Sequence, residues 1–156
     1  MKAVNIEEDL FDKSPFELSG GQKRRVAIAG IIALEPDILI LDEPTAGLDP
    51  RGAKEMMELF EKIHQNGTPI IMITHDMNMV LQHSSRAIVM SEGEIIYDGL
   101  PHDLFLQDNL EERYNVDIPM VLSFAKELKS KGLDIDLYKV LNVETLIEEI
   151  RRVYHG

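Results

Sequence analysis

The sequence predicts an α/β fold with parallel-sheet core strands, a β-hairpin at the edge of the sheet and a helical C-terminal extension. Two apolar runs, at residues 37–44 and 68–76, each end in polar side chains. Such runs are typical of strands buried on both faces of a parallel sheet. Stretches of helical character alternate with them, as in α/β folds. Polar groups at the ends of both strands indicate a site at that edge of the sheet.

The N-terminal part of the chain predicts one clear helix. Residues 1–13 are expected to be the tail of a short helix, and Pro15 favours an extended approach to the loop that follows it. The stretch 21–34 has helical length and content, with Ser19 at the position of an N-terminal cap and Pro36 just past its end.

A second helix is predicted between the two strands. Asp49 and Pro50 supply an N-cap and a proline at the first helical position. The helix is expected to end at the turn residues 66–67. Between these limits apolar residues recur at helical spacing, namely Ala53, Met56, Met57, Phe60 and Ile63. The pattern indicates an amphipathic helix.

Beyond the second strand the sequence predicts a short helix at about residues 77–83 and then a hairpin. The hairpin consists of apolar runs at 86–90 and 94–99, joined by a Ser-Glu-Gly turn. After residue 100 the chain changes to acidic helical stretches. We therefore expect two parts, a partial α/β domain at 1–100 and a helical extension at 101–156.

The composition excludes several classes of protein. The chain has no cysteine, which excludes disulfides, thiolate zinc sites and cysteine nucleophiles. Acids outnumber bases by 28 to 16, so nucleic acid is not expected as a partner. No apolar run approaches the roughly 20 residues that span a bilayer, and the first ten residues are too acidic for a secretory signal. Any membrane association is expected to run through a partner.

The loop Ser19-Gly20-Gly21 is suited to bind an oxyanion. Free backbone N–H groups and the positive end of the helix dipole meet at a helix start, and two glycines let an anion approach the backbone closely. Taken alone, the same three residues more often form an ordinary serine cap followed by a flexible glycine pair.

Two carboxylates close the first strand. Asp42 is placed to hold Mg²⁺, and Glu43 to orient or deprotonate an attacking water. His75 follows the second strand in the same way, where it could contact a terminal phosphate or that water. A plainer interpretation exists for all three residues. Asp42 and Glu43 could be solvated acids at the end of a strand, and His75 could be a structural histidine.

Four motifs occur in the order and approximate spacing of the ATP-binding-cassette (ABC) ATPases, which they closely resemble. They are LSGGQ at 18–22, ILILDEP at 38–44, AGLD at 46–49 and THD at 74–76. The resemblance implies that the chain is the C-terminal part of a P-loop NTPase domain that uses ATP and Mg²⁺.

The same resemblance assigns roles to individual residues. Glu43 would be the catalytic base and His75 the switch histidine, with Asp42 as the metal-binding acid. The residues that would bind ATP are Ser19, Gly20, Gly21, Gln22 and Asp49.

The stretches SPFELSGGQKRRVAIAG and EPTAGLDP resemble more narrowly the ATPase subunits of energy-coupling-factor transporters, which import vitamins and metal ions. That resemblance implies ATP hydrolysis that powers uptake, a second ATPase subunit paired head to tail, and a transmembrane partner subunit. It also implies a place on the cytoplasmic face of the membrane and a C-terminal extension used in pairing the two ATPases.

The family's P-loop, Gly-x-x-x-x-Gly-Lys-Ser/Thr, holds the β and γ phosphates of ATP. None of the ten glycines in this sequence is followed by lysine, and no glutamine precedes Gln22 to serve as the family's Q-loop. We therefore expect this chain alone to hydrolyse ATP negligibly, and to fold poorly because its buried strands need neighbours.

Three functional interpretations follow. The chain is the hydrolytic part of a transport ATPase and needs its other half, or it donates a half-site that completes the ATP site of an intact partner, or it is a remnant without function. The missing half would be lost by mutation, supplied by a second chain, or part of a longer protein.

Overall fold

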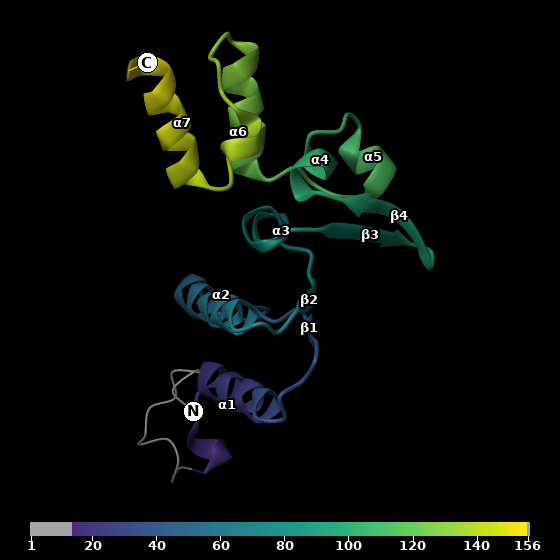
Figure 1. The fold of residues 1–156 in the computed structure, drawn as a ribbon, viewed down its shortest axis with the longest axis vertical. Helices are drawn as coiled ribbons and strands as arrows, with labels where there is room; N and C mark the ends of the chain where they lie inside the picture. The colour runs from purple at the N-terminus through teal and green to yellow at the C-terminus, as the bar shows by residue number, and fades with distance from the viewer. Residues whose placement is uncertain (1–13, 156) are drawn as a thin grey trace. The chain divides into compact units, whose positions relative to one another are not determined.

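The computed structural model describes residues 14–155 (Figure 1). The helix tail expected at residues 1–13 lies outside this range. The chain divides into two compact units, Met1–His75 and Asp76–Gly156. The domain boundary at residue 100 stays a prediction, because compact units and family domains are different divisions of a chain.

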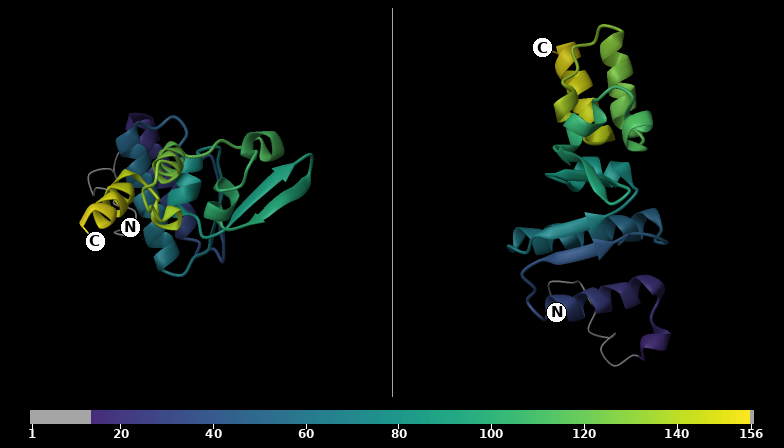
Figure 2. Two further views of the ribbon diagram at one scale, coloured as in Figure 1. Left: turned by 90° about the horizontal axis from the view of Figure 1, so that it is seen from above. Right: turned by 90° about the vertical axis from the view of Figure 1, so that its right-hand side faces the viewer.

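The first unit contains a two-stranded parallel sheet and two long helices. Its elements are the 3₁₀ turn η3 (Pro15–Glu17), α1 (Gly20–Ile32), β1 (Leu39–Asp42), α2 (Pro50–Gln65) and β2 (Ile70–Ile73). The strands pair in parallel, with register from Leu39 opposite Ile70 to Asp42 opposite Ile73. Both helices and both strands predicted here are confirmed, and α2 lies beside the sheet (Figures 1 and 2).

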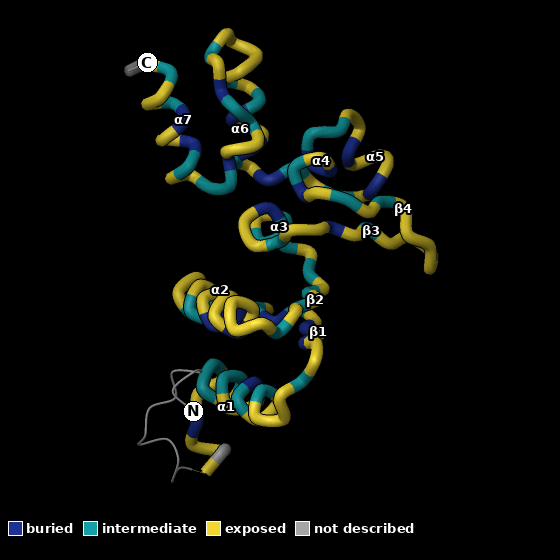
Figure 3. The backbone as a smooth tube through the Cα atoms, in the orientation of Figure 1, coloured by how far each residue is buried: buried dark blue, intermediate teal, exposed yellow. Residues whose placement is uncertain are grey.

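One face of this sheet is buried and the other is exposed. Leu39 and Leu41 are buried on β1, as is the apolar side of α2. The alternate residues Ile40, Ile71 and Ile73 are 62%, 50% and 54% exposed (Figure 3). The expectation that both faces are buried is wrong for this unit, since a sheet face stays exposed wherever no second layer covers it.

The second unit consists of a hairpin and a set of helices. Its elements are α3 (Met77–His83), β3 (Ala87–Ser91), β4 (Glu94–Gly99), α4 (Pro101–Phe105), α5 (Leu110–Tyr114), α6 (Met120–Ser130), the 3₁₀ turn η4 (Leu137–Lys139) and α7 (Val143–His155). The predicted hairpin is confirmed, and its turn places Glu92 and Gly93 at φ 50° and 84°. β3 and β4 form a sheet of their own, whereas the prediction had placed them at the edge of the parallel sheet.

A single apolar core joins the hairpin to the helical extension. The largest fully buried side chains in this unit are those of Leu81, Leu104, Phe105, Leu122, Ile135 and Val140. Leu81 comes from α3, before the hairpin, while the others follow it, and all belong to one cluster that also includes Ala87 of β3. The extension therefore shares its core with α3 and β3.

Glu149 of α7 is a buried carboxylate that ties this helix to the segment at Asp136. It accepts hydrogen bonds from the backbone N–H of Asp136 (3.1 Å) and from Nε and Nη2 of Arg152 (3.0 and 2.8 Å). The bond from Arg152, more than any other contact, lowers the pKa of Glu149. The carboxylate is thus held in its charged form.

We expect acid to destabilise the second unit partly through Glu149. Its pKa is lower in the folded chain, so its contribution is present above the ordinary glutamate pKa of about 4.3 and is lost as the pH falls through the folded value. Glu149→Gln should lower the urea midpoint at pH 7 and flatten its fall below about pH 4.5. The matched control is Glu148→Gln, at an exposed position of the same helix. An equally steep fall in wild type and Glu149→Gln would contradict the prediction.

Candidate functional site

The LSGGQ segment at residues 18–22, which we call the signature loop, forms a reciprocal cap at the start of α1. Ser19 Oγ accepts a hydrogen bond from the N–H of Gln22 (3.3 Å), and Gln22 Oε1 accepts one from the N–H of Ser19 (2.9 Å). This is a capping box, in which two N–H groups at the helix start are satisfied by side chains. Gln22 therefore points back along the helix start.

The segment between β1 and α2 turns sharply at two places. Glu43 and Gly47 have φ values of 44° and 73°. The Ala46 N–H donates to the Glu43 carbonyl oxygen, and the Leu48 N–H to that of Thr45, both at 3.1 Å. Asp49 Oδ1 then accepts from the Gly52 N–H at 2.6 Å and caps α2.

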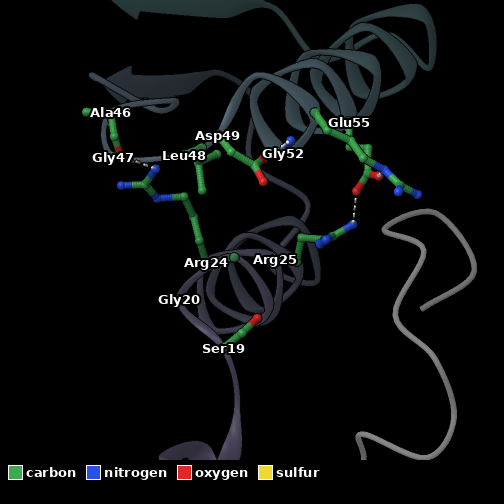
Figure 4. Close-up of a pocket in the computed structure, with 12 residues that line it drawn as sticks. Ser19, Gly20, Arg24, Arg25, Ala46, Gly47, Leu48, Asp49, Gly52 and Glu55 are labelled. Carbon is green, nitrogen blue, oxygen red and sulfur yellow. Dashed lines mark hydrogen bonds and ion pairs between the residues drawn. The ribbon is translucent and has the colours of Figure 1, made fainter.

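The signature loop and residues 46–49 line one pocket of about 560 Å³ (Figure 4). Four of the five residues predicted to bind ATP are among those that line it, namely Ser19, Gly20, Gly21 and Asp49. Gln22 is not among them. The structure thus brings together residues 30 positions apart in the sequence, although it does not test their roles.

Three arginines that sequence reasoning did not assign to a site also line the pocket, namely Arg24, Arg25 and Arg51. Two of them, Arg24 and Arg25, belong to the basic run at residues 23–25, which is visible in the sequence. No sequence feature near that run indicated that it faces a pocket. Glu55 accepts from Arg25 Nη1 and Arg51 Nε, each at 3.0 Å, and these bonds, first that from Arg51, lower the pKa of Glu55. With Asp49, the pocket carries three cationic and two anionic side chains, a balance that favours an anionic ligand.

Glu43 and His75 meet at the ends of the two parallel strands. Glu43 Oε1 lies 2.6 Å from His75 Nδ1 and accepts from the His75 backbone N–H at 3.1 Å. Parallel pairing aligns the carboxyl ends of β1 and β2, so residues just beyond them become neighbours. The contact fixes one side of the imidazole ring, as a carboxylate partner does for many functional histidines.

Asp42 is the exposed last residue of β1. Within residues 14–155, no cluster of three or more histidine or acidic side chains could hold a metal unaided. Mg²⁺ is commonly held by one or two carboxylates together with phosphate oxygens and water. Asp42 fits Mg²⁺ as one ligand of a shared site that a phosphate completes.

None of the helices that the structure describes combines the length and the apolar character needed to cross a bilayer.

Comparison with curated proteins gives close relatives over the whole chain. A family model described as ABC transporter matches residues 1–46. The chain is 46% identical, over 98% of its length, to the energy-coupling factor transporter ATP-binding protein EcfA2 of Streptococcus sanguinis, and 44% identical, over its full length, to that of Streptococcus agalactiae. It covers 53% and 54% of those two proteins, so it spans about half the length of the curated relatives that it matches.

Solved structures agree with the sequence relatives. The structure of cbiO1 from Clostridium perfringens, part of the ABC transporter complex cbiONQ, has a TM-score of 0.63 and 41% identity; the match covers 83% of this chain and 50% of that one. The ATP-binding cassette MJ0796, in a dimeric post-hydrolysis state bound to ADP and Pi, has a TM-score of 0.55 and 34% identity, over 64% and 43% of the two chains. The predicted fold class is therefore confirmed. With these motifs, this fold and these relatives, the chain is similar to about half of the ATP-binding proteins of energy-coupling factor transporters, and its family match is to the ABC transporters.

Proposed function

We propose that this chain is the signature-bearing part of an ATP-hydrolysing subunit that powers uptake by an energy-coupling-factor transporter. The observation that carries the proposal is the Glu43–His75 contact of 2.6 Å at the ends of two parallel strands. It supplies a carboxylate base and an oriented imidazole at one place, which is what attack of water on a phosphoryl group requires. The names of the relatives indicate a transporter as the setting.

In this proposal Glu43, His75 and Asp42 each have one role in ATP hydrolysis. Glu43 orients the attacking water and accepts its proton while the bond between the β and γ phosphates of ATP breaks and ADP leaves. His75, fixed by Glu43, lies beside the terminal phosphate. Asp42 holds Mg²⁺, which neutralises charge on the phosphates when it is bound. Phosphoryl transfer depends almost entirely on such positioning and charge stabilisation.

In our proposal the remaining parts of the transporter come from outside this sequence. The rest of the relatives' length supplies the P-loop, a second ATPase subunit pairs head to tail, and a transmembrane subunit holds the pair at the cytoplasmic face of the membrane. The dimeric form of a structural neighbour, MJ0796, supports pairing.

The test is complementation. This chain would be co-expressed with the part of the Streptococcus sanguinis relative that lies outside the match, and ATP hydrolysis by the purified pair would be measured against each half alone. We expect hydrolysis by the pair only. A well-folded pair that hydrolyses no ATP would overturn the proposal.

A second function is favoured by the pocket. The signature loop and Asp49 line one pocket, and Glu43 and His75 are not among the residues that line it. Such a surface could close over an ATP molecule held by the P-loop of another, intact subunit. The chain would then be a half-site donor rather than a hydrolase.

The two proposed functions predict different effects of the substitutions Ser19→Ala and Glu43→Gln on ATP hydrolysis. A half-site donor should stimulate an intact ABC ATPase subunit, and Ser19→Ala should reduce that effect roughly tenfold or more, the size of a lost hydrogen bond to a charged group. Glu43→Gln should leave it unchanged. The matched control is Ser14→Ala, because Ser14 also closes a capping box but lies outside the pocket.

Equal sensitivity to both substitutions would argue against the half-site donor and for the hydrolase. If wild-type chain neither complements the missing half nor stimulates an intact subunit, and melts without cooperativity, it is a remnant without function.

A further inference from the structure

Arg24 of α1 contacts the turn between β1 and α2 in an unusual way. Its Nη1 donates to the carbonyl oxygens of both Pro44 and Ala46, each at 2.9 Å. In Figure 4 the Arg24 side chain extends from α1 to the segment at Ala46 and Gly47. A single guanidinium nitrogen thus holds two carbonyl groups of one turn.

The carbonyl groups of Pro44 and Ala46 alternate in the sequence with two carbonyl groups that accept hydrogen bonds from N–H groups of the turn itself. The carbonyl oxygens of Glu43 and Thr45 accept from N–H groups within the turn. Those of Pro44 and Ala46 accept instead from Arg24. The turn is therefore held half from inside and half by the helix that carries the signature loop.

The turn needs such support because part of its backbone is strained. Glu43 has a φ of 44°, in the left-handed region that costs energy for residues other than glycine. Strained backbone persists where its surroundings hold it in place. Two charge-assisted hydrogen bonds from Arg24 provide that hold.

Its two neighbours in the sequence are placed differently. Lys23 is exposed, and Arg25 forms an ion pair with Glu55 of α2, which links helix to helix rather than helix to turn. The Arg24 contacts, by contrast, join the signature helix to the backbone of the turn, at Pro44 and Ala46.

We propose that Arg24 is a positioning residue that holds the turn at Pro44–Ala46 against α1, so that the signature loop and Asp49 face one pocket before any ligand binds. Through the same turn it also fixes the backbone next to Glu43. The catalytic consequence rests on the proposed function, whereas the structural one does not.

The first test is amide hydrogen exchange of the full chain by NMR. Arg24→Met keeps an unbranched apolar stem but removes the donors, and should speed exchange of the Ala46 and Leu48 amides roughly tenfold, the size expected for losing hydrogen bonds to a charged group. Arg24→Lys, which keeps a charged donor, should restore most of the protection. Lys23→Met is the control for loss of charge on the same helix and should change nothing.

The α2 amide of Phe60 reports whether the variants are folded, because that residue is buried and distant from the turn in sequence. Unchanged exchange at Ala46 and Leu48 in Arg24→Met would overturn the proposal. Rapid exchange of these two amides in the wild type would also overturn it. So would an Arg24→Lys variant in which they exchange as fast as in Arg24→Met.

The second test is hydrolysis by the complemented pair described above. Arg24→Met should lower kcat about tenfold with little change in the KM for ATP, since the P-loop of the other half holds the nucleotide, and Arg24→Lys should recover most of the rate. Altered exchange with an unchanged kcat would overturn the catalytic consequence alone. A wild-type pair without activity would overturn the proposed function, while the exchange experiment would still decide the role of Arg24.

Discussion

Glu43→Gln is expected to lower kcat for ATP hydrolysis by the complemented pair by about 10²–10⁴-fold, the usual contribution of a general base. Glutamine keeps the size of the side chain and an oxygen that can accept from the His75 N–H. It cannot accept a proton from the attacking water. Because only the chemical step is affected, the KM for ATP should change little. Steady-state hydrolysis at saturating ATP measures the effect.

The matched control is Glu92→Gln. Glu92, like Glu43, is an acid with a positive φ, here 50°, but it is exposed and lies in the hairpin turn. It should leave hydrolysis unchanged. A loss of less than about tenfold in Glu43→Gln would mean that another group takes the proton.

A double-mutant cycle with His75→Ala tests whether the two residues act as a unit. Residues that do so lose far less on the second substitution than on the first. We therefore expect His75→Ala to cost little in the Glu43→Gln background. Full additivity would mean that the contact of 2.6 Å between them does not matter to the reaction.

Phe105→Ala is expected to destabilise the second unit by about 3–5 kcal/mol, the range for removing a buried phenylalanine. The side chain is 0% exposed and lies in the core that joins the hairpin to the extension. Domains of ordinary size have a total stability of about 5–15 kcal/mol, so this one change should bring the unit close to unfolding.

All four tyrosines of the chain lie in the second unit and there is no tryptophan, so tyrosine fluorescence in urea follows the unfolding of that unit. The control is Phe124→Ala, which removes the same side chain from a position that is 50% exposed. It should cost about 1 kcal/mol. Equal losses in the two variants would contradict the burial that the structure assigns to Phe105.

Local patterns of the sequence were sufficient for most of the secondary structure. The helix Pro50–Gln65 was predicted because its cap, its proline and its apolar spacing all lie within the helix or directly before it. The hairpin was predicted from two apolar runs around a Ser-Glu-Gly turn. The family followed from four short motifs in order, each recognisable without any knowledge of contacts.

The tertiary structure decided which of these residues meet. The Glu43–His75 contact spans 32 positions of the sequence, and the contact from Arg24 to Pro44 spans 20. The motifs place Glu43 and His75 in one site through resemblance, but no motif assigns a partner to Arg24. Its role depends on two carbonyl groups whose direction is set by the turn.

The sequence by itself determined the order of helices and strands from residue 21 to residue 99, the absence of cysteine chemistry and of a P-loop within these residues, and the family resemblance. Only the tertiary structure decided that Ile40, Ile71 and Ile73 are exposed although their strands look fully buried, and that the extension shares a core with α3 and β3. The physical reason is the same in both cases. A hydrophobic pattern states that a face can be buried, but which layer covers it depends on segments that are distant in the chain.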